Sequence, residues 1–187
     1  FVVKHADDVA IEDNEIVPYF DPVAKDDSET INEGIRLIET TGSTVRDNTI
    51  VGVGGDKQVN EIDGEDNELI GADGIGIFVQ NSSNNSLSDN LVEKSGLGLF
   101  VYNANDNNDD SNDVDGDTYK YNLFGGVVLN NSDDNELKDL NVFENGAPVP
   151  SNGYNRAWGV RFVYADDNIL SNSKIYENNQ GGIQLLG

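Results

Sequence analysis

The most regular feature of the chain is a glycine followed by two apolar residues placed two positions apart. This motif recurs six times. Alternation with a period of two is typical of a β-strand that buries one face. The six copies occupy residues 34–37, 74–77, 96–99, 126–129, 159–162 and 182–185. They predict six short strands in equivalent environments.

A second pattern follows each of these strands. Two apolar residues stand five positions apart, with polar residues between them. The pairs are Ile11/Ile16, Val45/Ile50, Leu87/Val92, Val114/Tyr119, Leu137/Val142 and Leu170/Ile175. An asparagine stands two residues before the first member in four copies, at Asn85, Asn112, Asn135 and Asn168. If the copies stack, these amides should bond to one another in a ladder.

The spacing of the copies predicts a solenoid. Gly74 and Gly96 are 22 residues apart, and Gly159 and Gly182 are 23 apart, whereas other intervals are longer because loops have been inserted. A unit of this length accommodates three short strands but cannot bury its own apolar face, so stacking must bury it. A propeller blade would need about twice that length. We therefore expect one domain over residues 1–187, forming a segment of a longer chain.

The stretch over residues 126–142, Gly-Val-Val-Leu-Asn-Asn-Ser-Asp-Asp-Asn-Glu-Leu-Lys-Asp-Leu-Asn-Val, resembles the right-handed parallel β-helix repeat family of the NosD-like, carbohydrate-binding and sugar-hydrolase type. The resemblance covers nearly the whole chain. It implies an all-β fold, a right-handed parallel β-helix of about 6–7 rungs. Members include polysaccharide lyases, hydrolases, epimerases, viral tail spikes and adhesins, so the fold does not decide the function.

Three insertions share one phase of the repeat, at about residues 17–33, 51–73 and 143–157. They should therefore cluster along one side of the solenoid, where they could wall a groove. A fourth, at residues 103–112, follows the first strand of its rung instead. The segment 51–73 allows two interpretations, a loop or a degenerate rung.

The charge balance narrows the range of partners. Acidic residues outnumber Lys and Arg by 35 to 11, giving a net charge of −24. This excludes nucleic acid as an expected partner and disfavours an anionic membrane surface. No apolar run is long enough for membrane insertion. Such a composition is typical of haloarchaeal proteins, and we expect an extracellular or cell-surface location in high salt. The alternative is a calcium-loaded surface protein from a less salty habitat.

Catalytic groups in this family usually lie on the outward positions of the first strand. The copies as aligned above place Arg36, Gly76, Gly98, Val128, Arg161 and Gln184 there, with Ile38, Phe78, Phe100, Asn130, Val163 and Leu186 in the next column. Neither column holds the carboxylate pair that glycoside hydrolysis needs. The sequence therefore argues against an enzyme without excluding one. Phe78 and Phe100 predict a covered surface, a sugar-stacking surface, or rings that join the core.

Two further clusters are candidates for binding. Tyr154, Arg156 and Trp158 place aromatic rings beside a guanidinium, which suits a glycan, although Trp158 could equally pack against the coil. Asp113, Asp115 and Asp117 alternate around Gly116 and resemble a calcium loop, but the EF-hand spacing fails. The other interpretation of these three carboxylates is a solvated acidic loop.

Two functions follow. The first is a structural or glycan-binding module of a secreted, cell-surface or viral-fibre protein, whose partners would be a polysaccharide or surface glycan, or further copies of itself through stacking or trimer formation. The second is a polysaccharide lyase, hydrolase or epimerase acting on acidic glycans, with Arg161 or Arg36 as base or charge clamp. Calcium is the one cofactor the sequence suggests.

Overall fold

The computed structural model describes residues 1–17, 33–53, 56–59, 68–71, 74–104, 112–146 and 157–187. Nearly all its strands belong to three parallel sheets, named here sheets A, B and C. Sheet A contains β1 (Val2–Lys4), β4 (Glu33–Ile38), β9 (Ile75–Gln80), β12 (Leu97–Tyr102), β15 (Gly125–Asn130), β18 (Trp158–Val163) and β21 (Gly181–Leu186). Sheet B contains β2 (Ala10–Glu12), β5 (Thr44–Arg46), β10 (Ser86–Ser88), β13 (Asp113–Asp115), β16 (Glu136–Lys138) and β19 (Ile169–Ser171). Sheet C contains β3 (Glu15–Ile16), β6 (Thr49–Val51), β11 (Leu91–Glu93), β14 (Thr118–Lys120), β17 (Asn141–Phe143) and β20 (Lys174–Tyr176).

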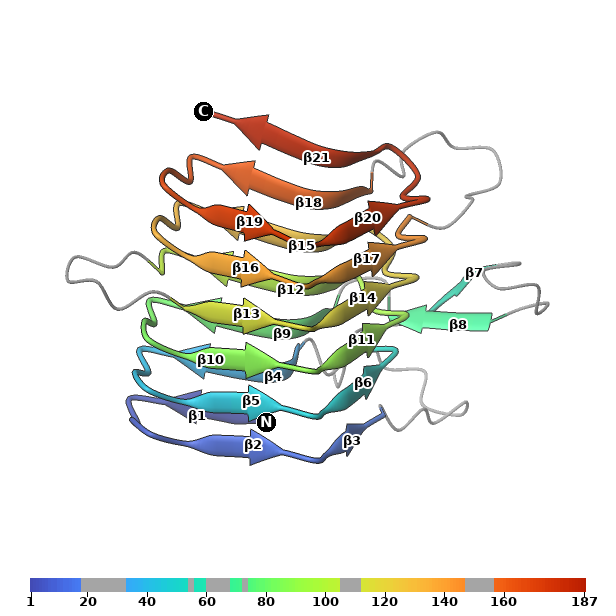
Figure 1. The fold of residues 1–187 in the computed structure, drawn as a ribbon. Coiled ribbons are helices and arrows are strands. Elements are labelled where there is room, and N and C mark those ends of the chain that lie inside the picture. Colours follow the sequence, from blue (N-terminus) through green and yellow to red (C-terminus); the bar gives the residue numbers. More distant parts are fainter. Residues whose placement is uncertain (18–32, 54–55, 60–67, 72–73, 105–111, 147–156) are drawn as a thin grey trace.

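The chain visits the sheets in the order A, B, C and then repeats, so each circuit forms one rung directly above the previous one (Figure 1). The seven strands of sheet A and the six of each other sheet confirm the predicted all-β right-handed parallel β-helix and its rung number. Among the described residues, no helix is long and apolar enough to span a membrane.

Apolar side chains from equivalent positions stack into continuous columns that fill the interior. Sheet A supplies two columns, and sheets B and C supply one each. The sheet C column is Ile16, Ile50, Val92, Tyr119, Val142 and Ile175, and the sheet B column is Ile11, Val45, Leu87, Val114, Leu137 and Leu170. These are the apolar pairs that the sequence spaced five residues apart. Each pair therefore spans the turn between sheets B and C.

The entry of the chain into sheet A requires glycine. A Cβ atom on Gly76 would lie 2.1 Å from Cγ1 of Val92 and 2.8 Å from the carbonyl oxygen of Gly98, so no side chain fits at this corner. The column is Gly34, Gly76, Gly98, Gly126, Gly159 and Gly182. The sequence alignment, which placed Gly74 and Gly96 in it, was therefore wrong by two residues in these two rungs.

The predicted asparagine ladder is present. Nδ2 of Asn85 donates to Oδ1 of Asn112, Asn112 donates to Asn135, and Asn135 donates to Asn168, each across 3.0 Å. Two further ladders were not predicted. One lines the turn before sheet C and consists of Asn14, Asn48, Asn90 and Asp117. The other lines the corner after sheet C and consists of Asn122, Asn145 and Asn178. The interior therefore contains polar columns that are hydrogen-bonded from rung to rung.

The three insertions that share a phase follow β3, β6 and β17, always between sheet C and the next strand of sheet A, as expected. The fourth follows β12, between sheets A and B. Within 51–73, β7 (Asp56–Val59) and β8 (Glu68–Gly71) pair antiparallel and contribute no strand to the parallel sheets. The hairpin projects from the side of the stack (Figure 1), so the described residues of this segment after β6 form no rung.

Candidate functional site

The outward surface of sheet A differs in chemistry from the rest of the molecule, and we call it the sheet A face. Its residues alternate along each strand with buried ones such as Leu37 and Val79. The first outward column is Val2, Arg36, Phe78, Phe100, Val128, Arg161 and Gln184. The second is Lys4, Ile38, Gln80, Tyr102, Asn130, Val163 and Leu186.

These columns correct the predicted ones. Because the register of two rungs shifts by two residues, Phe78 and Phe100 replace Gly76 and Gly98 in the first column and lie in line with Arg36 and Arg161. In the second column, Gln80 and Tyr102 occupy the positions that were predicted for Phe78 and Phe100. The sequence alignment therefore missed Gln80 and Tyr102 as surface residues, although alignment on Gly76 and Gly98 would have found them.

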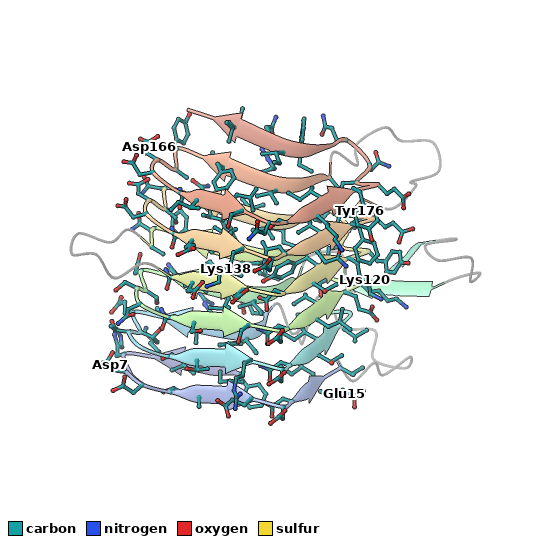
Figure 2. All side chains as sticks on the ribbon, in the orientation of Figure 1. Asp7, Glu15, Lys120, Lys138, Asp166 and Tyr176 are labelled. Carbon is teal, nitrogen blue, oxygen red and sulfur yellow. The ribbon has the colours of Figure 1, made fainter. Side chains whose placement is uncertain are left out.

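No acidic residue occurs in either column of the sheet A face, which instead carries Lys4, Arg36 and Arg161. Elsewhere carboxylates are abundant. Figure 2 shows Asp7 and Asp166 at the edge of the stack where sheet A gives way to sheet B. In a chain of net charge −24, the sheet A face is therefore a local region of positive charge and apolar side chains.

The two phenylalanines of the first column stack on each other. Their ring centroids lie 5.3 Å apart and their planes differ by 6°. The guanidinium carbon of Arg36 lies 5.1 Å from the centroid of the Phe78 ring, and Phe100 packs at a tilt against Tyr102 with centroids 6.0 Å apart. Arg36 and Phe100 therefore contact Phe78 from the rungs on either side. This leaves the ring edges, rather than its faces, for contact with a ligand.

The two arginines of the column differ in their partners. Nη1 of Arg36 lies 3.3 Å from Oε1 of Glu33, and Nη2 donates across 3.1 Å to Oε1 of Gln80. Arg161 makes no ion pair within the part of the chain that the structure describes. The Nε atoms of both arginines are buried without a hydrogen-bond partner. The Oε1 atom of Gln184 is also buried without a hydrogen-bond partner. Gln184 lies opposite Arg161 in the register of β18 and β21.

Only one member of the predicted aromatic cluster can be placed. Tyr154 and Arg156 lie outside the described residues. Trp158 opens β18, and its indole lies against Gly181 of the next rung, where an added Cβ would come within 2.5 Å of Cζ3. Trp158 is therefore packed partly against the coil. It starts the same strand that carries Arg161, on the sheet A face.

The three predicted calcium ligands point to different environments. Asp113 and Asp115 flank the buried Val114 on the outside of β13, where Nζ of Lys138 lies 3.3 Å and 3.5 Å from their respective Oδ2 atoms. Figure 2 shows Lys138 on this side of the stack. Asp117 is fully buried. The structure therefore does not bring the three carboxylates together, and no metal-binding group of three is present among the described residues.

Asp117 occupies a ladder position in place of asparagine. Its Oδ1 accepts hydrogen bonds from the backbone N and Nδ2 of Asn90, at 2.7 and 3.1 Å, and its Oδ2 accepts one from the Tyr119 hydroxyl at 2.6 Å. Burial raises the pKa of Asp117 to about 7, although these hydrogen bonds lower it. Burial next to Asp117 also raises the pKa of the Tyr119 hydroxyl. The pair is part of the interior and not of the surface.

A second aromatic group lies on the outside of sheet C. Phe143 and Tyr176 stack with centroids 5.0 Å apart and planes 3° apart, and the ring of Tyr121 meets Phe143 edge-on. Lys120 pairs with Glu93 at 2.9 Å in the same column. This group was not predicted. Unlike the sheet A face, its column contains a carboxylate that neutralises the nearby cation.

Comparison with known families gives one match. A family model described as "Periplasmic copper-binding protein (NosD)" matches residues 8–187. Neither a curated protein nor a solved structure gives a significant match. The match includes every strand from β2 to β21.

Proposed function

We propose that this chain, which belongs to the NosD family of periplasmic parallel β-helix proteins, is a glycan-binding module acting outside the cytoplasm. The sheet A face is the proposed binding surface. A polysaccharide would lie across several rungs and contact the edges of Phe78 and Phe100, the phenol of Tyr102 and the two arginines. The surrounding rungs act as a rigid scaffold.

The observation that carries this proposal is the chemical contrast between the sheet A face and the rest of the chain. A protein with 35 acidic residues has no carboxylate in two columns that extend over seven strands. Tyr102 and Leu186 are exposed on this face, whereas Phe78 and Val128 are buried within the first column. Exposed apolar area bordered by polar groups is typical of interaction surfaces. Amides and guanidinium groups provide the directional hydrogen bonds that sugar hydroxyls require. A structural role alone does not require two neighbouring columns without a carboxylate.

The enzyme alternative receives less support. Glycoside hydrolysis normally uses two carboxyl groups. Among the described residues, the carboxylate of Glu33 beside the first column is already paired with Arg36, and that of Glu39 lies against His5. A guanidinium remains protonated at neutral pH, so Arg36 and Arg161 suit charge clamps better than general bases. We therefore propose binding rather than cleavage.

The copper in the family description does not fit the side chains of this protein. Copper is held by thiolate, thioether or imidazole ligands, and the chain has no Cys, no Met and a single histidine, His5. Nδ1 of His5 lies 2.6 Å from Oε2 of Glu39. Calcium would need a cluster of oxygens, and Asp113, Asp115 and Asp117 do not converge. We assign no metal-dependent step to this chain.

The description of the family as periplasmic agrees coarsely with the predicted extracellular or cell-surface location. We further propose that this location is salt-rich. A net charge of −24 repels itself in dilute buffer, and dissolved ions at molar concentration reduce the Debye length to about 3 Å. Salt would therefore permit an acid-coated protein to approach a glycan surface.

A matched pair of variants tests the proposed surface. Tyr102→Glu introduces a carboxylate at the end of β12 on the sheet A face, and Ser88→Glu introduces one at the end of β10 on sheet B. Binding is measured by affinity electrophoresis in dextran, xylan, galactomannan, polygalacturonate and alginate. We expect retardation by at least one polymer, lost in Tyr102→Glu and kept in Ser88→Glu. Equal effects of the two variants, or no retardation by any polymer, would contradict the proposal.

A second copy of the chain is the other candidate occupant of this face, through stacking or trimer formation. Light scattering distinguishes the two. A monomer that binds glycan supports the proposal, whereas an oligomer that Tyr102→Glu dissociates would assign the face to self-association.

A further inference from the structure

We propose that Arg161 and Gln184 form a subsite for a uronate unit, so that the glycan bound by the sheet A face is an acidic one. This inference rests on the proposed function, because it names the class of glycan. The two residues are paired across β18 and β21 in the first outward column. Trp158 begins the same strand as Arg161.

The first argument is the state of the polar atoms. Nε of Arg161 and Oε1 of Gln184 are both buried, and neither has a hydrogen-bond partner. Leaving such groups unsatisfied is unfavourable, and native proteins contain few of them. One is a donor and the other an acceptor. A ligand that satisfies both must therefore present an acceptor and a donor on neighbouring groups.

The second argument is charge. Among the described residues, Arg161 has no carboxylate partner, although acidic residues outnumber Lys and Arg by 35 to 11. Among the described arginines, Arg36 is paired with Glu33 and Arg46 with Glu12, and Arg161 alone has no ion pair. Lys120 and Lys138 are also paired, whereas the exposed Lys4 and Lys174 make no ion pair among the described residues. An unpaired guanidinium is therefore unusual in this chain. It points to an anion that is supplied from outside.

The chemistry of a uronate meets both requirements. Its planar carboxylate can accept two parallel hydrogen bonds from the guanidinium, one of them from Nε, in the geometry that distinguishes arginine from lysine. A ring hydroxyl of the same sugar can donate to Oε1 of Gln184. A neutral sugar offers hydroxyls but no charge for Arg161. An isolated sulfate group offers acceptors but no donor for Gln184.

The position of the subsite relative to the other arginine gives the ligand a direction. Arg36 and Arg161 lie in one column, separated by Phe78, Phe100 and Val128. With neighbouring strands about 4.8 Å apart, this separation is about 19 Å along the stack. Arg36 is already bound to Glu33, so the strong anion site is at the Arg161 end. The glycan should run along the axis of the coil, with a carboxylate fixed at that end.

The test compares hexameric oligogalacturonate with its methyl ester, which has the same rings but no charge, in 1 M NaCl. Binding is followed by calorimetry and by fluorescence of Trp158, the only tryptophan. We expect the acid to bind at least tenfold more tightly than the ester. Arg161→Gln should reduce affinity for the acid at least tenfold and leave affinity for the ester unchanged. Arg161→Lys, which keeps the charge but lacks Nε, should fall between the two.

The control is Arg46→Gln, which removes a guanidinium that is bound to Glu12 on sheet B, and it should bind like the native chain. Far-UV circular dichroism checks that each variant folds. Equal binding of acid and ester would overturn the uronate subsite and leave the glycan proposal standing. No binding of either hexamer, or of the polymers above, would overturn both. If Arg161→Gln and Gln184→Ala lowered the melting temperature without changing affinity for the acid, the two side chains would serve only each other.

Discussion

The hydroxyl of Tyr119 donates a 2.6 Å hydrogen bond to Oδ2 of Asp117, and both side chains are fully buried in the interior of the coil. Asp117 is the last residue of the ladder that begins with Asn14, Asn48 and Asn90. The next rung has Leu140 at the equivalent position, and leucine offers no side-chain acceptor. A carboxyl group receives hydrogen bonds from Asn90 and from Tyr119 without needing an acceptor above it. Its charge, however, is costly in this environment.

The first prediction concerns the effect of pH on this pair. The pKa of Asp117 is about 7 in the folded chain against an ordinary 3.8, so the folded state holds a proton that the unfolded state releases. The stability that the neutral carboxyl provides is complete below about pH 3.8 and is lost as pH rises to about 7, by roughly 4 kcal/mol in total.

The measurement is the free energy of unfolding of native chain and Asp117→Asn between pH 4 and pH 8 at fixed salt. The difference between the two cancels the titration of the other carboxylates. We expect the advantage of Asp117→Asn to grow with pH, because its amide is neutral throughout whereas the native carboxyl becomes charged. A pH-independent difference would show that Asp117 does not titrate in this range.

The second prediction concerns the glycine corner. Gly76→Ala places a Cβ within 2.1 Å of Val92 and 2.8 Å of a backbone oxygen and should cost about 1–3 kcal/mol of stability. Gly182→Ala is its matched control, since the same column position there meets only Cγ2 of Ile175, at 3.7 Å. Urea unfolding measures both. Equal destabilisation would mean that backbone freedom, rather than packing, selects glycine here.

The third prediction compares a buried with an exposed amide. Asn112 accepts from both the backbone N and Nδ2 of Asn85 and donates to Asn135 and to the carbonyl oxygen of Ser82. Asn112→Ala leaves several buried groups unpaired and should cost about 3 kcal/mol or more. Asn103→Gly removes an exposed amide that bonds to Asn81 and Asn131, at a φ of +53° that glycine tolerates, and should cost under about 1 kcal/mol. Similar losses in the two variants, by chemical denaturation, would argue that the ladders do not stabilise the interior.

The fourth prediction concerns salt. With a net charge of −24, the folded chain repels itself when counter-ions are dilute. We expect the melting temperature to fall steadily as NaCl is lowered from molar to millimolar concentration. Sucrose at matched osmolality is the control, because it does not screen charge. A melting temperature that ignores salt, or that responds equally to sucrose, would rule out the salt-adapted interpretation.

The sequence was sufficient for the repeat but not for its register. Residues 74–77 and 76–79 both begin with glycine and continue with apolar residues two positions apart, so the period of two cannot decide between them. The contact of Gly76 with Val92, a residue of another sheet, decides it. The same ambiguity at Gly96 and Gly98 shifted Phe100 and Tyr102. Knowledge of the corner geometry would have corrected both.

The sequence pattern did not predict that Asp117 is buried, and the reason is different. The alternation of Asp113, Val114 and Asp115 continues in sequence through Gly116 to Asp117, and it suggests three carboxylates on one side. Gly116 has a φ of +74°, so the chain turns there and the phase of the alternation changes. Asp117 therefore points inward, into the asparagine ladder. Period-two reasoning holds within a strand and fails across a turn with positive φ.

Three of the four insertions occur at one corner, between the end of a sheet C strand and the start of the next sheet A strand. Because the rungs above and below pair through their own strands, a segment of any length can leave and rejoin at this corner without altering the stacking. The rungs and the insertions of the coil therefore have separate roles. Its rungs keep the architecture constant, while insertions at this corner can change in length without a change in the pairing of the strands.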